Sequence, residues 1–168
     1  MELKLEKMQL KDIAKVAEIN VTGWKIAYAS FFDKNFLNSL TIKDKVEKLN
    51  KNYGKDNIVV AKIINDVVGF CRYTFKSELT QRLNVDGEIQ TFYVQPNLTR
   101  NGIGTFIFNN IKKLFLANNK HTCALWCFQE AEQAKLFYTK MGGKVVITEE
   151  RRIGSKRYTD LLFVFNFS

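Results

Sequence analysis

The first fifty residues alternate apolar and polar positions briefly and then repeat apolar residues at helical spacing. Glu2–Met8 alternates, which predicts an edge-like strand. Asp12 follows as a candidate helix cap, and a stripe spaced by three and four residues comes after it. The stripe comprises Ile13, Val16, Ala17, Val21, Trp24, Ala27, Tyr28 and Phe31. Two further helices are expected to begin near Asp33 and Thr41.

The pattern changes to strands after this helical region. Three segments are rich in β-branched and apolar residues: Asn57–Ile64, Val67–Phe75 and Asp86–Val94. Later segments read as a helix at Asn101–Asn118, a strand at Thr122–Phe128, a helix at Glu130–Met141, and strands at Lys144–Arg152 and Tyr158–Phe167. Asn65-Asp66 and Gly154-Ser155 suit hairpin turns, and Gly142-Gly143 suits a helix end. Together these elements predict a mixed α/β sheet with helices on both faces.

Length and composition indicate a folded protein of one domain. The chain has 168 residues, of which 46% are apolar and 13% aromatic, and such a chain can bury a substantial core. We therefore expect a single domain over residues 1–168. No apolar run approaches the ~18 residues needed to cross a bilayer. The charged start MELKLEKMQLKD does not resemble a secretory signal, so a cytoplasmic protein is expected.

The chain is basic, with 26 Lys+Arg against 17 Asp+Glu and a formal net charge of +9. Such an excess attracts nucleic acid, anionic membranes or phosphorylated ligands. The lysines are nevertheless spread along the chain between acidic residues. The densest basic cluster, RRIGSKR at Arg151–Arg157, suits a hairpin tip. We therefore expect neither nucleic acid nor a membrane as a partner.

Cysteine and histidine content argues against a disulfide framework and a metal site. The three cysteines are Cys71, Cys123 and Cys127, and the last two lie in the apolar run HTCALWCF. An odd number of cysteines without a signal peptide disfavours disulfides, and free cysteine is usually buried. His121 is the only histidine. We expect buried thiols at Cys123 and Cys127 and no metal ion.

The stretch VQPNLTRNGIGTFIF, Val94–Phe108, places a glycine-rich turn between a predicted strand and a predicted helix. The N–H groups of a first helical turn lack partners, and the helix dipole makes that end positive. Gly102 and Gly104 would let an anion approach closely, and Arg100 adds a charge, so the turn suits a phosphate or pyrophosphate. The dinucleotide fingerprint fails at Ile107, and the chain has no GK[ST] of a P-loop. A purely structural turn stays open at this point.

Two separated motifs resemble the GNAT superfamily of acetyl-CoA-dependent N-acetyltransferases. The family's phosphate motif [QR]-x-x-G-x-[GA] follows a strand, and here FYVQP is followed by TRNGIG. A later family pattern, N-x-x-A-x-x-F-Y-x-x-x-G, is filled at Ala134, Phe137, Tyr138 and Gly142. Thr99 stands where the family has Gln or Arg, and Ala131 stands where an Asn often contacts the cofactor. The resemblance is specific over residues 86–142, and WKIAYASFF with FLNSL also looks like the family's substrate-side helices.

The resemblance implies the fold, the co-substrate and the residues that bind it. The fold would be a mostly antiparallel sheet of about seven strands flanked by helices on both faces. Acetyl-CoA would be the co-substrate, with its pantetheine arm paired to the main chain of Phe92, Tyr93 and Val94. The pyrophosphate would lie on the N–H groups of a run of six residues: Arg100, Asn101, Gly102, Ile103, Gly104 and Thr105.

The resemblance also implies acetyl transfer to a primary amine of a small molecule or peptide, by direct attack through a tetrahedral intermediate. Glu88 resembles the family's strand glutamate that acts as general base, and Tyr138 matches its tyrosine general acid. Trp24, Tyr28 and Phe31 would wall the acceptor pocket. Each of these residues has a plainer alternative: a solvated strand position for Glu88, and core packing for the tyrosines and other aromatics. A non-catalytic CoA-binding sensor or protein-interaction domain of the same fold is the alternative function, and a homodimer stays open.

Overall fold

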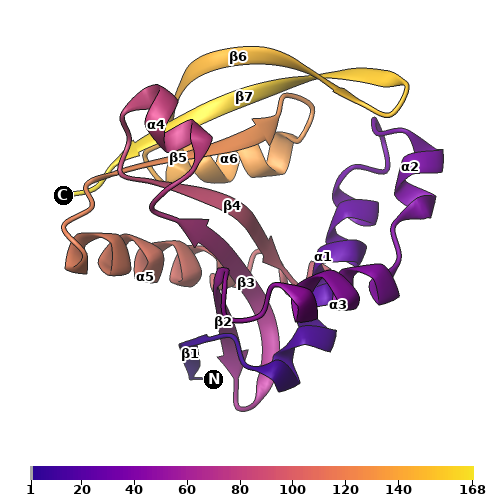
Figure 1. Ribbon diagram of the computed structural model, residues 1–168, viewed down its shortest axis with the longest axis horizontal. Helices are drawn as coiled ribbons and strands as arrows, with labels where there is room; N and C mark the ends of the chain where they lie inside the picture. Colours follow the sequence, from indigo (N-terminus) through magenta and orange to yellow (C-terminus); the bar gives the residue numbers. More distant parts are fainter. Residues whose placement is uncertain (1) are drawn as a thin grey trace. The chain divides into compact units, whose positions relative to one another are not determined.

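The computed structural model describes residues 2–168 (Figure 1). The strands are β1 Leu3–Lys7, β2 Asn57–Ile63, β3 Asp66–Thr74, β4 Gly87–Val94, β5 Thr122–Phe128, β6 Lys144–Ile153 and β7 Lys156–Asn166. The helices are α1 Ile13–Ala27, α2 Lys34–Ser39, α3 Ile42–Lys51, α4 Glu78–Leu83, α5 Ile103–Ala117 and α6 Glu132–Lys140, with 3-10 turns η1 Leu10–Asp12 and η2 Pro96–Leu98. The strands form one seven-stranded sheet in the order β1-β2-β3-β4-β5-β7-β6. β4 and β5 are parallel, whereas β1–β2, β2–β3, β5–β7 and β6–β7 are antiparallel. The predicted mixed, mostly antiparallel fold is confirmed.

The chain forms two compact units. The first unit comprises the residues up to Tyr73 together with Thr91–Asn110, and the second comprises Thr74–Gln90 and Ile111–Ser168. Strand β4 and helix α5 each contribute residues to both units. The expectation of one domain over residues 1–168 stays a prediction.

The core of the first unit lies between helices α1 and α3 and the strands β2 and β3. Its buried side chains are Met8, Ile13, Val16, Ala17, Ile19, Leu49, Ile58, Val60, Val67 and Phe70. The neighbouring position Gly69 points to the opposite face, because side chains alternate along a strand. A Cβ at Gly69 would lie 2.8 Å from Cδ1 of Ile107 in α5. Helices therefore cover both faces of these strands.

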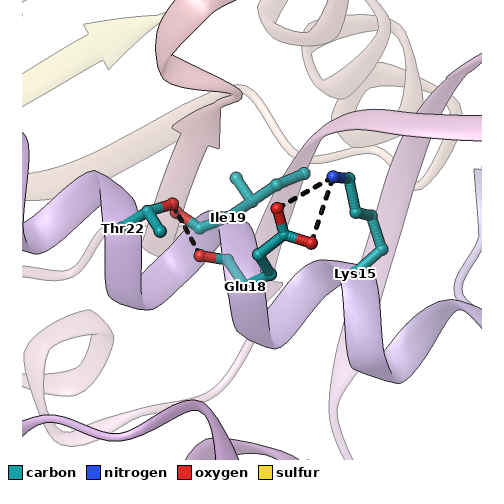
Figure 2. Close-up of polar contacts among 4 residues, drawn as sticks. All are labelled: Lys15, Glu18, Ile19 and Thr22. Carbon is teal, nitrogen blue, oxygen red and sulfur yellow. Dashed lines mark hydrogen bonds and ion pairs between the residues drawn. The ribbon is translucent and has the colours of Figure 1, made fainter.

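Helix α1 carries local polar contacts among half-buried side chains (Figure 2). Lys15 Nζ donates to both carboxylate oxygens of Glu18, at 3.0 and 3.1 Å. One turn later, Thr22 Oγ1 donates to the carbonyl oxygen of Glu18 at 2.7 Å. A hydroxyl that bonds back to the fourth preceding carbonyl slightly weakens a helix, and Gly23 follows directly. The residues of α1 that favour a helix least therefore lie in the last turns of this helix, near its C-terminal end.

The expected capping role of Asp12 is wrong. Asp12 precedes α1, but its side chain makes no cap bond there. Its carboxylate instead accepts the N–H of Gln9 at 2.9 Å and pairs with Lys62 Nζ at 3.0 Å. Both side chains of this pair are 4% exposed, and Lys62 also reaches Glu6 at 3.1 Å. The reason is that Asp12 already has helical backbone angles, φ −87° and ψ −16°, as the last residue of η1, so its carboxylate bonds back to Gln9 in the capping box of η1 and not forward to α1.

Two other helix starts are confirmed, and one turn is shifted. Asp33 accepts the N–H of Phe36 at 2.9 Å, and Thr41 accepts the N–H of Asp44 at 3.1 Å. The β2–β3 turn lies at Ile64-Asn65 instead of Asn65-Asp66, because β3 already begins at Asp66. A register shift between Ala61 and Lys62 accompanies the change. As a result Ile64 is 84% exposed with φ +58°.

The second unit contains a helix that the hydrophobic pattern did not predict. Helix α4 begins with a capping box: Ser77 and Thr80 exchange backbone-to-side-chain hydrogen bonds of 2.8 and 3.2 Å. Its Leu79 is buried with Ala124 of β5 and Leu162 of β7. A helix of only six residues, capped by Ser and Thr, lacks the longer apolar repeat on which helix prediction depends.

Strands β6 and β7 form the closing hairpin, as predicted (Figure 1). Ile153 pairs with Lys156 around the turn, and Gly154 has φ +61°. β6 is the last strand of the sheet order, and most of its residues are exposed. Its pairing with β7 shifts register between Val145 and Ile147. The basic cluster Arg151–Arg157 therefore lies at a hairpin tip, as its sequence indicated.

Candidate functional site

The glycine turn follows β4 in the first unit and is held by its own backbone and side chains. Gln95 N–H donates to the carbonyl of Val68 at 2.8 Å, which ties the end of β4 to β3. Thr99 Oγ1 donates to the carbonyl of Pro96 at 3.1 Å, and Asn101 Nδ2 donates to that of Leu98 at 3.3 Å. Thr99, which departs from the family motif, thus has a local role in closing η2.

The backbone before α5 takes a conformation that exposes the helix start. Arg100 has φ +63° and Gly102 has φ +79°, both in the left-handed region that glycine tolerates best. A Cβ at Gly102 would meet no atom within 4 Å. The first bond of the helix runs from Phe106 N–H to the carbonyl of Gly102 at 2.9 Å. The N–H groups of Ile103 to Thr105 precede it and so have no acceptor within the helix, which suits an anion.

Five aromatic residues gather at the end of α1 and the start of α2. They are Trp24, Tyr28, Phe31, Phe32 and Phe36. Trp24 meets Tyr28 edge to face at 4.9 Å between ring centroids and Phe32 at 5.4 Å. Phe32 is buried, whereas Trp24 and Tyr28 are partly exposed. One ring of the group is therefore buried in the core, whereas two others are accessible, as the lining of a ligand pocket would be.

Tyr93 of β4 joins this group through two contacts. Its hydroxyl lies 3.3 Å from the hydroxyl of Tyr28, and its ring stacks on Phe70 at 6.1 Å. A Cβ at Gly23 would lie 2.6 Å from Cδ1 of Tyr93, so the glycine in α1 makes room for this ring. Its neighbour Phe92 points the other way, to Phe108 of α5 at 6.5 Å.

Glu88 lies in the second unit at the point where β4 joins β5. Only Gly87 and Glu88 pair with β5 among the described residues, opposite Cys123 and Ala124. Glu88 is partly exposed, whereas the flanking Gly87 and Ile89 are buried, because side chains alternate between the two faces of a strand. The side chain of Glu88 is therefore held at a fixed register beside β5.

Asp86 joins β4 to β5 at this point through a set of hydrogen bonds, called here the Asp86 clamp. Its carboxylate accepts the N–H groups of His121 at 2.7 Å and Thr122 at 3.0 Å and the Thr122 hydroxyl at 3.1 Å. Its own N–H donates to Thr122 Oγ1 at 2.8 Å. The His121 N–H bond, with the Thr122 bonds and the charge of Lys120, lowers the pKa of Asp86 against the opposing effect of burial. The ionised carboxylate of Asp86 thus holds β4 against β5 next to the pair formed by Glu88 and Ala124.

Tyr138 lies on α6 in the second unit and is 9% exposed. Its ring is 5.7 Å from Phe163 and 6.3 Å from Phe165, both of β7. Its carbonyl accepts the N–H of Gly143 at 2.9 Å, where the chain leaves the helix. The ring is thus part of the core, and any chemistry must come from its hydroxyl.

The cysteines behave as buried thiols. All three are free and buried. Burial, reinforced by the charge of Asp160, raises the pKa of Cys127 to about 12, and burial also raises the pKa of Cys123. Such thiols stay protonated and are poor nucleophiles. No cluster of three His, Cys, Asp or Glu side chains that could hold a metal occurs within residues 2–168. No helix in that range is long and apolar enough to cross a membrane.

Comparison with known families decides the classification. Residues 24–143 match the model of the acetyltransferase (GNAT) family. This match covers well over half of the chain. The chain belongs to the GNAT acetyltransferase family. The match includes the aromatic group, β4, the glycine turn and α6, so the family resemblance read from the two motifs is confirmed.

Relatives and solved structures agree with this assignment. A Bacillus subtilis (strain 168) protein named Uncharacterized N-acetyltransferase YuaI is 22% identical over 153 residues, which is 91% of this chain and 87% of YuaI. The PaiA N-acetyltransferase of Thermoplasma acidophilum, solved in complex with coenzyme A, superposes with a TM-score of 0.77 at 18% identity, covering 99% of this chain and 100% of PaiA. YncA of Salmonella typhimurium, solved with its cofactor acetyl-CoA, gives 0.71 at 11% identity over 100% and 95% of the two chains. At these identities the structures establish a shared GNAT fold.

The structure groups the predicted residues by unit. The first unit brings Trp24, Tyr28 and Phe31 together with Tyr93, and it also contains the turn from Arg100 to Thr105. Glu88 and Tyr138 lie in the second unit.

Sequence reasoning missed three residues that make close contacts beside the predicted site residues. They are Gly23, Gly69 and Asp86. A lone glycine within a helical or strand pattern signals close approach of another chain segment, and this signal was present at Gly23 and Gly69. Asp86 gave no comparable signal, because its partner Thr122 is distant in sequence.

Proposed function

We propose that this GNAT protein transfers the acetyl group of acetyl-CoA to a primary amine of a small molecule or peptide. The observation that carries the proposal is the backbone around Gly102. There the left-handed residues Arg100 and Gly102 precede a helix start whose N–H groups have no acceptor within the helix. The space beside Gly102 is open, and an anionic pyrophosphate fits this combination.

The proposed binding of acetyl-CoA uses the main chain of two neighbouring segments. The six residues from Arg100 to Thr105 would hold the pyrophosphate through backbone N–H groups and the charge of Arg100. Phe92, Tyr93 and Val94 would pair with the pantetheine arm as an added strand does. This role is supported by the pairing of β4 with β5, which covers only the first two residues of β4 within the described part of the chain.

The proposed chemistry needs a base for the amine and an acid for the thiolate. An alkyl amine has a pKa of about 10 and arrives protonated at neutral pH. Glu88 would accept its proton directly or through one water. Tyr138 would donate a proton to the departing CoA thiolate from its hydroxyl. Trp24, Tyr28 and Phe31 would line the acceptor pocket, where aromatic faces attract a cationic amine.

Calorimetric titration with acetyl-CoA, CoA and NAD tests the binding step. Saturable binding of acetyl-CoA and CoA without binding of NAD is expected. Gly104→Asp should weaken acetyl-CoA binding at least tenfold, because a carboxylate at the helix start repels the pyrophosphate. Asn109→Asp is the matched control, since it adds the same charge at an exposed position later on α5. Equal affinity of the two variants for acetyl-CoA would contradict the proposal that the glycine turn binds the pyrophosphate.

Turnover with a panel of amines then separates an enzyme from a CoA-binding sensor. Tyr138→Phe should lower kcat by about 10²-fold or more while leaving acetyl-CoA affinity nearly unchanged, because it removes only the hydroxyl. Tyr158→Phe is the control, since Tyr158 is also a buried tyrosine of the second unit, at 5% exposure. Acetyl-CoA binding without turnover on any amine would favour the sensor function.

A further inference from the structure

The aromatic group at the end of α1 and the start of α2 leaves most of its rings accessible. Phe32 is 3% exposed and packs against all four other rings, at 5.3 to 6.1 Å between centroids. Those four rings, Trp24, Tyr28, Phe31 and Phe36, are only half-buried and are called here the aromatic wall. Neighbouring aromatic side chains that stay accessible mark a contact site for a ligand or partner. Packing alone therefore explains Phe32 but not the aromatic wall.

The backbone fixes the positions of these rings. Trp24 and Tyr28 are one helical turn apart and so lie on the same side of the chain, and the N–H of Tyr28 donates to the carbonyl of Trp24 at 3.1 Å. The N–H groups of Phe31 and Phe32 both donate to the carbonyl of Tyr28, at 3.2 and 2.9 Å. The turn that carries the rings is thus closed by its own hydrogen bonds. A ligand would find the aromatic wall already formed, which lowers the cost of binding.

Tyr93 connects the aromatic wall to the proposed acetyl-CoA site. Its hydroxyl lies 3.3 Å from the hydroxyl of Tyr28, and both residues belong to the first unit. The main chain of the same Tyr93 is proposed to pair with the pantetheine arm. A group bound beside the wall would therefore lie about one side-chain length from that arm. An acceptor whose body lies on the wall would bring its nitrogen to the thioester if only a short chain joins the two.

The charges of this segment disfavour an acceptor with several positive groups. Residues 13–40 contain two carboxylates, Glu18 and Asp33. Glu18 forms an ion pair with a lysine one turn earlier at 3.0 Å, and Asp33 caps α2 by accepting a backbone N–H at 2.9 Å. Lys25 and Lys34 line a surface hollow of the same segment. A polyamine or aminoglycoside would therefore meet lysines here, and both carboxylates of the segment are already engaged.

We propose that the acceptor is a primary amine joined by a short alkyl chain to an aromatic ring, and that this ring packs on the aromatic wall. The inference names the acceptor class for the proposed acetyl transfer and rests on that transfer. Edge-to-face contacts of the kind already present in the wall add to the apolar area that a ligand ring would bury. A phenyl ring buried in this way is worth about tenfold to a hundredfold in kcat/KM relative to an amine without one.

The aromatic ring does not alter the transfer itself. The lone pair of the neutral amine attacks the thioester carbonyl carbon, and the C–N bond forms. The C–S bond breaks, and its electron pair leaves with the CoA sulfur, which takes up one proton, while the nitrogen loses one. The products are an N-acetyl arylalkylamine and free CoA. The ring therefore contributes through binding and orientation, so its effect should appear both in the Kd of the amine and in kcat/KM.

Two measurements on the same amines test the acceptor class separately from the transfer. The amines are phenethylamine, cyclohexylethylamine, propylamine and spermidine. Turnover is measured with acetyl-CoA, and binding is measured by calorimetry on the CoA-saturated protein, in which no transfer can occur. Phenethylamine should have the highest kcat/KM and the lowest Kd, with propylamine and spermidine about tenfold or more weaker. Cyclohexylethylamine has the same carbon skeleton without an aromatic ring and should lie between them.

Variants of Tyr28 test whether the aromatic wall selects the ring. Tyr28→Leu removes one ring and should lower the preference for phenethylamine over propylamine by about three- to tenfold. Tyr28→Phe keeps the ring and should retain the preference. Tyr53→Leu is the matched control, since Tyr53 is also an accessible tyrosine of the first unit, at 41% exposure, and lies outside the wall. Circular dichroism confirms that the three variants fold.

The outcomes separate the acceptor class from the proposed transfer. Acetylation of propylamine or spermidine without a preference for phenethylamine would overturn the acceptor class and leave the transfer supported. Binding of phenethylamine that is lost in Tyr28→Leu, without turnover, would support the acceptor class and contradict the transfer. An unchanged preference in Tyr28→Leu, an equal loss in Tyr28→Phe, or the absence of both binding and turnover with phenethylamine would overturn the inference.

Discussion

The buried pair of Asp12 and Lys62 gives the most direct test of the energetics of the first unit. Asp12→Asn removes the charge but keeps an oxygen for the Gln9 N–H. It leaves the ammonium of Lys62, which is 4% exposed, with only the half-exposed Glu6. Breaking a buried pair on one side costs about 3–5 kcal/mol. We expect about 3 kcal/mol, because Glu6 remains 3.1 Å from Lys62. Urea unfolding at pH 7 measures this loss.

Matched variants separate the buried pair from the exposed one. Glu6→Gln should cost less than about 1 kcal/mol, because its side chain is 45% exposed and water screens the interaction. Lys62→Met alone should cost about as much as Asp12→Asn, since it leaves the buried Asp12 carboxylate without its lysine partner. The double variant Asp12→Asn/Lys62→Met should recover most of the loss, because it leaves no unpaired buried charge. Additive costs, or an Asp12→Asn loss below about 1 kcal/mol, would refute this reasoning.

Three further predictions concern the clamp, a close contact and a strained turn. Asp86→Asn should cost about 1–3 kcal/mol at pH 7. The pKa of Asp86 is lowered from 3.8, so this stability is present above that value and is lost as pH falls through the folded pKa. The acid-unfolding curves of the wild type and Asp86→Asn should therefore converge at low pH, and parallel curves would contradict the clamp. Gly23→Ala should lower stability by about 1–2 kcal/mol despite its better helix propensity, because the new Cβ would lie 2.6 Å from Tyr93 Cδ1; a rise in Tm would show that the ring yields. Ile64→Asn should stabilise by about 1 kcal/mol, because a β-branched residue is strained at φ +58° and asparagine is not; an unchanged denaturation midpoint would contradict strain at this turn.

The sequence predicted the parts of the fold that depend on regular spacing. Helix α5 is buried at Ile103, Ile107, Ile111 and Phe115, which follow one another every four residues and so lie on one face of the helix. Its start was predicted two residues early, at Asn101. Arg100 and Gly102 take left-handed backbone angles there, and such angles delay a helix. The same two residues, together with Gly104, gave the anion-binding hypothesis, so the early predicted start lies at the candidate site itself.

What the sequence did not predict depends on contacts between distant residues. Asp12 had a suitable position for a helix cap, but Lys62 lies fifty residues away and claims its carboxylate. Tyr93 was assigned only a main-chain role, whereas its ring and hydroxyl contact Gly23 and Tyr28 of the first unit. Spacing rules describe neighbours on one element, and none of them pairs a strand residue with a helix seventy residues earlier.

The exposed strand β6 bears on the solubility of the protein. An outermost strand offers unpaired N–H and C=O groups to any other chain with an extended segment, which is a common route to aggregation. Here Glu149, Glu150, Arg151 and Arg152 place consecutive charges along that strand, and the register shift near Val145 interrupts its regularity. Val145 and Val146 are 47% and 55% exposed beside that irregularity. The charges in the second half of β6 therefore protect this strand against self-association, and the protection is weakest at Val145 and Val146.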